Sequence, residues 1–112
     1  MTITNYHSQA CFEAWMNCEN LLLNMTEAKI FVSKKITRVI DECALLCMGT
    51  FKALKSSSAN LHRMALLCVG ICEECAELLE EQKDSHFREC AKVCRECSNV
   101  ISPLAFPAAI LQ

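Results

Sequence analysis

Cysteine is the residue type in this chain with the clearest capacity for chemistry. Ten of the 112 residues are cysteine, and within each part of the chain they recur at spacings of three, four or seven residues. They are Cys11 and Cys18, then Cys43 and Cys47, then Cys68, Cys72 and Cys75, and finally Cys90, Cys94 and Cys97. The last two sets repeat the motif C-x3-C-x2-C. These spacings return to one face of a helix, so they predict stripes of thiols, which are ligands for soft metal ions.

The start of the chain bears on whether these thiols stay reduced. Residues 1–10 have no basic start, no apolar stretch and no twin arginine, so we expect a cytoplasmic protein. Thiols in the cytosol are usually kept reduced. Ten reduced cysteines in one small domain favour metal binding over cross-linking.

The cysteine stripes must be positioned by helices, because no stretch alternates in the manner of a strand. We predict an all-α fold, an antiparallel up-down-up-down four-helix bundle with a cysteine-lined core over residues 1–102, followed by an apolar tail over 103–112. The expected helices run from about Asn5 to Asn24, from an N-cap at Thr26 to about Leu54, from the end of a linker over residues 55–60 to about Lys83, and from an N-cap at Asp84 or Ser85 to a stop at Pro103.

Folding the sequence back at the three expected turns predicts which thiols lie level. Cys47 falls beside Cys68, and Cys68 beside Cys97. Cys43 falls level with Cys72, Cys94 and the region of His7, whereas Cys75 falls level with Cys90 and Cys11, and Cys18 lies alone. One half of the core is then sulfur, and the other half is hydrocarbon.

The thiols also allow interpretations other than copper binding. Reduced cysteine is a small hydrophobe, so the thiols could be inert core residues. Cross-helix disulfides could form on oxidation, although pairs four residues apart on one helix fit the bond poorly. The alternative function is therefore a redox-responsive or structural cysteine-rich bundle that forms disulfides or binds Zn²⁺. Iron–sulfur binding is disfavoured because the motifs lie in helices and not in loops.

Electrostatics favours monovalent copper as the metal. Four thiolates around Zn²⁺ leave a net charge of −2, which is costly in a dry core. Cu(I) is soft, and a thiolate can bridge two ions, so about one Cu(I) per bridging thiolate leaves the core neutral. A pair such as Cys43 and Cys47 could hold one Cu(I) on a single helix.

The four stripes with their C-x3-C and C-x3-C-x2-C motifs resemble the cysteine-rich four-helix-bundle copper storage proteins over residues 5–101. The resemblance implies a tube of thiolates that binds several Cu(I) per chain, assembly into a homo-tetramer or other homo-oligomer, and the cytosolic branch of the family. It also implies loading through an open mouth that bears His and Met. Met48, His62 and Met64 are the candidates here, and His7 could complete the middle layer.

Other function classes find little support. The formal net charge of −2 and pI of about 5.9 argue against a nucleic-acid partner. Apolar runs such as Ala65–Ile71 are far too short to span a membrane. No Ser/His/Asp set, phosphate loop or matched carboxylate pair is visible, so we expect a protein that is not an enzyme.

Overall fold

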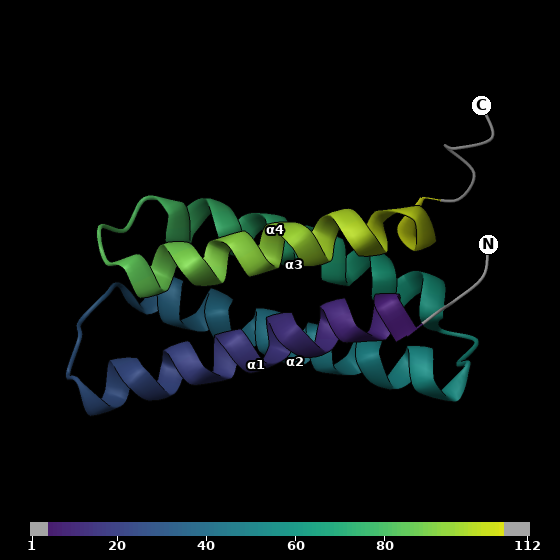
Figure 1. Ribbon diagram of the computed structural model, residues 1–112, viewed down its shortest axis with the longest axis horizontal. Helices are drawn as coiled ribbons and strands as arrows, with labels where there is room; N and C mark the ends of the chain where they lie inside the picture. Colours follow the sequence, from purple (N-terminus) through teal and green to yellow (C-terminus); the bar gives the residue numbers. More distant parts are fainter. Residues whose placement is uncertain (1–4, 107–112) are drawn as a thin grey trace.

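The computed structural model describes residues 5–106 and contains four helices packed side by side (Figure 1). They are α1 (Asn5–Glu27), α2 (Lys34–Ser56), α3 (Leu61–Glu80) and α4 (Ser85–Ala105). Each helix packs on its neighbours in sequence, and α4 closes the ring against α1. In Figure 1 the chain reverses direction at each connection. The predicted all-α four-helix bundle is therefore confirmed. Within residues 5–106, no helix has the length and apolarity needed to cross a membrane.

The connection between α1 and α2 differs from the prediction. Thr26 was the expected N-cap of the second helix, but it lies in the last turn of α1, where its hydroxyl donates to the Leu22 carbonyl at 3.1 Å. The N-cap of α2 is Ser33, whose side chain accepts a hydrogen bond from the Ile36 amide at 3.3 Å. Because the turn between the helices lies over residues 28–33, α1 is shifted along α2 relative to the predicted register.

The ends of the other helices lie closer to the prediction, although α3 ends at Glu80, before the expected Lys83. Asp84 caps α4 by accepting from the His86 amide at 2.8 Å. The expected end of α4 at Pro103 is wrong, since the helix continues to Ala105. Ile101 and Ala105 are buried in this last turn, and their packing offsets the hydrogen bond that proline cannot donate. Residues 107–112 of the predicted tail lie outside the described residues.

The prediction of one sulfur half and one hydrocarbon half is only partly right, because apolar side chains close the core at both ends. Toward the α1–α2 and α3–α4 connections, the core consists of large apolar side chains, with Leu21, Leu79 and Phe87 all buried. Ile101 and Leu54 close the core at the opposite end. The cysteines lie between these two apolar layers.

Replacing Phe87 by alanine is expected to destabilise the reduced, metal-free protein by about 3–5 kcal/mol, since it empties the largest fully buried side-chain position. Chemical denaturation followed by circular dichroism measures the change. Phe31→Ala is the matched control, because Phe31 is 90% exposed and its loss should cost less than about 0.5 kcal/mol. Equal effects of the two substitutions would contradict this picture of the core.

Candidate metal centre

All ten cysteines are free thiols, and every one of them faces the interior of the bundle. None of their side chains is more than 2% exposed. The helical stripes explain this result, because each cysteine lies on the same face as buried apolar residues of its own helix, such as Ala14 and Leu21 on α1. The predicted cysteine-lined core is confirmed.

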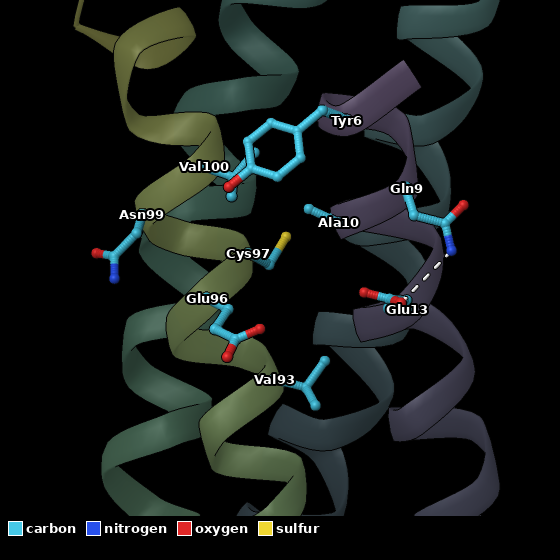
Figure 2. Close-up of a pocket in the computed structure, with 9 residues that line it drawn as sticks. All are labelled: Tyr6, Gln9, Ala10, Glu13, Val93, Glu96, Cys97, Asn99 and Val100. Carbon is cyan, nitrogen blue, oxygen red and sulfur yellow. Dashed lines mark hydrogen bonds between the residues drawn. The ribbon is translucent and has the colours of Figure 1, made fainter. Parts of the chain in front are cut away.

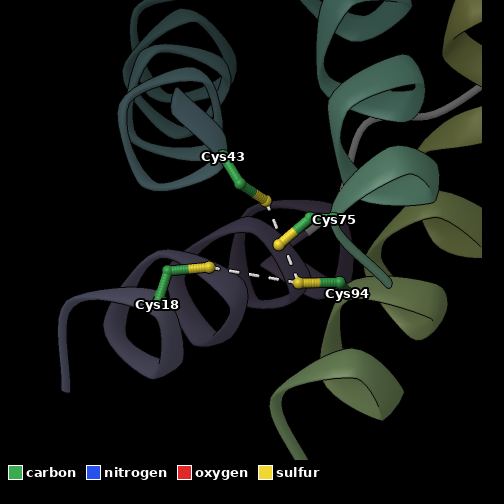
Figure 3. A group of neighbouring side chains, drawn as sticks. All are labelled: Cys18, Cys43, Cys75 and Cys94. Atoms are coloured by element: carbon green, nitrogen blue, oxygen red, sulfur yellow. Dashed lines mark hydrogen bonds between the residues drawn. The ribbon is translucent and has the colours of Figure 1, made fainter. Parts of the chain in front are cut away.

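Eight of the thiols form two groups in which all four sulfur atoms lie within 4.8 Å of one another. The first group is Cys18, Cys43, Cys75 and Cys94, with one residue from each helix. Figure 3 shows their side chains pointing toward a common centre. The second group is Cys47, Cys68, Cys72 and Cys97, from α2, α3 and α4.

The two groups join into one continuous chain of sulfur contacts along the bundle. Successive Sγ–Sγ distances are 3.9 Å for Cys90–Cys18, 4.0 Å for Cys18–Cys94, 3.9 Å for Cys94–Cys43, 3.8 Å for Cys43–Cys72, 3.6 Å for Cys72–Cys47, 3.9 Å for Cys47–Cys68 and 4.0 Å for Cys68–Cys97. We call these eight residues the sulfur chain; it includes Cys90, which belongs to neither group, and leaves out Cys75. An ion held at any point along it has further sulfur ligands within reach on both sides.

Two of the predicted levels are wrong, and both concern α1. Cys18 does not lie alone, because its sulfur contacts those of Cys90 and Cys94. Cys11 is not level with Cys75 and Cys90; its neighbours are Cys68 and Cys97. The cause is the later turn between α1 and α2, which moves both α1 cysteines relative to the other helices. The predicted pairs of Cys47 with Cys68, Cys68 with Cys97, and Cys43 with both Cys72 and Cys94 are confirmed.

One core position that interrupts the thiol pattern escaped the sequence analysis. Thr50 follows Cys47 by three residues and so occupies the third place of a C-x3-C-x2-C motif on α2. It is fully buried, and its hydroxyl donates to the Leu46 carbonyl at 2.8 Å and lies 3.2 Å from the Met64 carbonyl. The repeated spacing was the signal that could have found it.

Hydrogen bonding among the thiols sorts them into two kinds. S–H donation from neighbouring cysteines lowers the pKa of four thiols that accept such bonds, namely Cys43, Cys68, Cys94 and Cys97. Hydrogen bonding together with burial raises the pKa of the other six, namely Cys11, Cys18, Cys47, Cys72, Cys75 and Cys90. Each four-thiol group therefore contains two thiols of raised and two of lowered pKa.

The surroundings of the sulfur atoms favour a soft ion of low charge. The buried polar side chains among residues 5–106 are His7, Ser8, Thr50 and Ser98, so no buried lysine or arginine balances a negative cluster. A zinc tetrathiolate in each group would leave two negative charges there without a partner. Cu(I) shared between bridging thiolates leaves no net charge, and its softness matches an all-sulfur donor set.

The four predicted accessory residues lie outside both four-thiol groups. His7 is buried, whereas His62 is exposed and has its Nδ1 3.3 Å from the Leu104 carbonyl oxygen. Met48 and Met64 are half-buried. The Met64 methyl group approaches α2 closely at Gly49, since a Cβ there would lie 2.6 Å from it. Ligation by these four residues stays a prediction.

Comparison with known proteins gives one match. The family model described as copper storage protein matches residues 2–105. No curated protein matches the chain, and no solved structure does so.

Proposed function

Since this chain belongs to the copper storage protein family, we propose that its buried cysteines hold several Cu(I) ions per chain and release them on demand. The observation that carries this proposal is the sulfur chain, whose neighbouring Sγ atoms lie 3.6–4.0 Å apart in a core with no buried cation among the described residues. Its role is storage or buffering of copper, in place of catalysis.

The proposed ligands are all ten cysteines. A pair four residues apart on one helix, such as Cys43 and Cys47, provides two thiolates for one Cu(I). Contacts between helices, such as Cys43 with Cys72 at 3.8 Å, allow a thiolate to bridge two ions. Bridging keeps the number of Cu(I) ions close to the number of thiolates, so the filled interior remains neutral.

The proposal extends to the setting in which the protein works. Cysteines bind Cu(I) only while they stay reduced, which fits a reducing compartment, and we place the chain in the cytoplasm. Family membership supports assembly into a homo-oligomer, with a homo-tetramer as the first expectation. Sedimentation equilibrium of the reduced protein tests the assembly independently of copper.

Anaerobic titration of the reduced protein with Cu(I), against a chromogenic Cu(I) chelator, tests the storage function. We expect several ions per chain to be withheld from the chelator. Binding of one ion or none would overturn the proposal. Counting free thiols before and after mild oxidation tests the alternative, because a redox-responsive bundle would lose thiols reversibly and change its oligomeric state.

Proton release during the same titration distinguishes Cu(I) from Zn²⁺. Each Cu(I) displaces at most about one proton, because each adds about one thiolate to the cluster. A zinc tetrathiolate would displace at least two, since each group holds two thiols of raised pKa, such as Cys18 and Cys75 in the first. Every displaced proton weakens binding about tenfold for each pH unit of acidification, so Cu(I) affinity should fall as the pH falls. A pH-independent affinity would contradict thiolate binding.

A further inference from the structure

The outer face of α3 has an apolar centre that is exposed to solvent. Leu66 and Leu67 are 39% and 49% exposed, and Gly70 in the next turn is exposed as well. By their spacing these residues lie on the side of α3 opposite its buried cysteines. Single exposed leucines are ordinary on a protein surface, but neighbouring ones are a feature of interaction surfaces.

Gly70 has no explanation within the chain. Glycine inside a helix is less favourable than any other residue except proline, because it orders a flexible backbone. The other glycine, Gly49, leaves room for the Met64 methyl group, which would lie 2.6 Å from a Cβ there. A Cβ at Gly70 would meet nothing within 4 Å. The missing side chain therefore leaves a space on the surface, into which a second molecule can approach the backbone closely.

The apolar centre lies between charges of opposite sign. Arg63 precedes the leucines and Glu74 follows the glycine, and both are exposed. Among residues 5–106, the ion pairs of α3 join Glu73 and Glu80 to Arg95 of α4, so Arg63 and Glu74 take part in none. Arg63 and Glu74 are eleven residues apart, about 16 Å along the helix axis, and are therefore too distant to pair within one chain.

Two such faces complement each other when their helices run antiparallel. If Leu67 of one copy lies over Gly70 of the other, Arg63 of the first copy lies opposite Glu74 of the second. A two-fold axis repeats both contacts, as it does in every symmetric dimer. The leucine then fills the space above the glycine, and opposite charges meet on both sides of it. This match within one sequence favours a second copy as the occupant of the face.

The neighbouring faces are less suited to a second copy. Between α1 and α4 the surface is hollowed by a pocket of about 280 Å³. Figure 2 shows Glu13 and Glu96 on its two sides, and a two-fold pairing of this face would bring like charges together. Between α1 and α2, the rings of Phe12, Trp15 and Phe51 already pack on one another, with centroids 5.8–6.0 Å apart.

We propose that two copies of this chain associate through the outer faces of antiparallel α3 helices, with Leu67 seated on Gly70 and Arg63 paired with Glu74. This inference rests on the proposed homo-oligomeric assembly and assigns its contact surface. A two-fold contact joins the copies in pairs, and a tetramer then consists of two such pairs. The cysteines of α3 lie on its opposite side, so association and copper binding can be tested separately.

Filling the space above Gly70 tests the contact without harming the fold. Gly70→Gln introduces a good helix former where nothing obstructs it, so helix content measured by circular dichroism should not fall. Sedimentation equilibrium of the reduced, metal-free protein should show a dissociation constant raised at least about tenfold. Leu67→Gln should act in the same way. Leu23→Gln is the matched control, because it removes a leucine that is 57% exposed on α1 and should leave association unchanged.

Reversing the paired charges gives a sharper test. Arg63→Glu and Glu74→Arg each place like charges on both sides of the contact, so each variant alone should dissociate at least about tenfold more readily. An equimolar mixture of the two variants restores opposite charges on both sides and should associate again. This recovery can only arise between molecules. Failure of the mixture to associate would overturn the proposed register.

The unaltered protein distinguishes the assembly from its contact surface. A monomer at every concentration would overturn both, and the face would then belong to a different partner. Association that is unaffected by Gly70→Gln and by the charge variants would overturn this contact alone. Cu(I) capacity in the anaerobic titration should be equal in all of these variants, so a failure of the storage function would appear there and not in the association.

Discussion

Loading the reduced protein with Cu(I) is expected to raise its melting temperature by tens of degrees. The thiols of four helices meet only in the folded bundle, so Cu(I) binds the native state far better than the unfolded chain. At a free concentration about 1,000 times Kd, one ion stabilises a protein by about 4 kcal/mol. For a domain of this size each kcal/mol shifts the melting temperature by about 4 °C, so three ions already produce a rise of roughly 50 °C.

Circular dichroism at 222 nm, recorded anaerobically with and without Cu(I), measures this rise. Removal of the metal with an excess of a strong Cu(I) chelator should restore the original melting temperature, which excludes disulfide formation as the cause. Zn²⁺ should stabilise less, because each tetrathiolate site leaves buried charge without a partner. A shift of only a few degrees with Cu(I) would mean that the ions do not join the four helices.

Replacing one four-thiol group should remove roughly two fifths of the copper capacity, because it removes four of the ten thiolates over which bridged ions are spread. The variant Cys18→Ser/Cys43→Ser/Cys75→Ser/Cys94→Ser removes the group shown in Figure 3 and leaves the second group intact. Hydroxyl oxygen is a hard donor with little affinity for Cu(I). The fold should survive, since a buried hydroxyl can bond to the carbonyl four residues earlier, as Thr50 does with Leu46 at 2.8 Å. Anaerobic titration and circular dichroism measure capacity and helix content on the same sample.

The matched control is the reciprocal variant, Cys47→Ser/Cys68→Ser/Cys72→Ser/Cys97→Ser. Both variants should retain part of the capacity. Retention of full capacity by the first variant would contradict ligation by its four cysteines.

The sequence predicts both the helices and the inward direction of the thiols, because cysteines and apolar residues recur at the same helical spacing. Spacings of three and four residues place cysteines on the same stripe as Leu21, Leu79 and Ile101, and burial of that stripe follows. The levels of the thiols within α2, α3 and α4 were predictable because their connections are short and marked by Ser57, Asn60 and Asp84.

The register of α1 was not predictable in the same way. Thr26 and Ser33 are both acceptable N-caps, and local sequence does not decide between them. The choice depends on packing along the whole of α1, which brings Cys18 to Cys94 and Cys11 to Cys97. An error of a few residues in one turn changes which thiols meet across the bundle without changing which face they occupy.

The lack of buried cations among residues 5–106 has a consequence for how filling is sensed from outside. Where a copper ion replaces a proton, it brings the same charge, so filling at the six thiols of raised pKa leaves the net charge unchanged. Full and empty molecules then differ in charge by far less than the number of ions they hold and should elute close together from an ion exchanger. A partner that distinguishes them has rigidity as its larger signal.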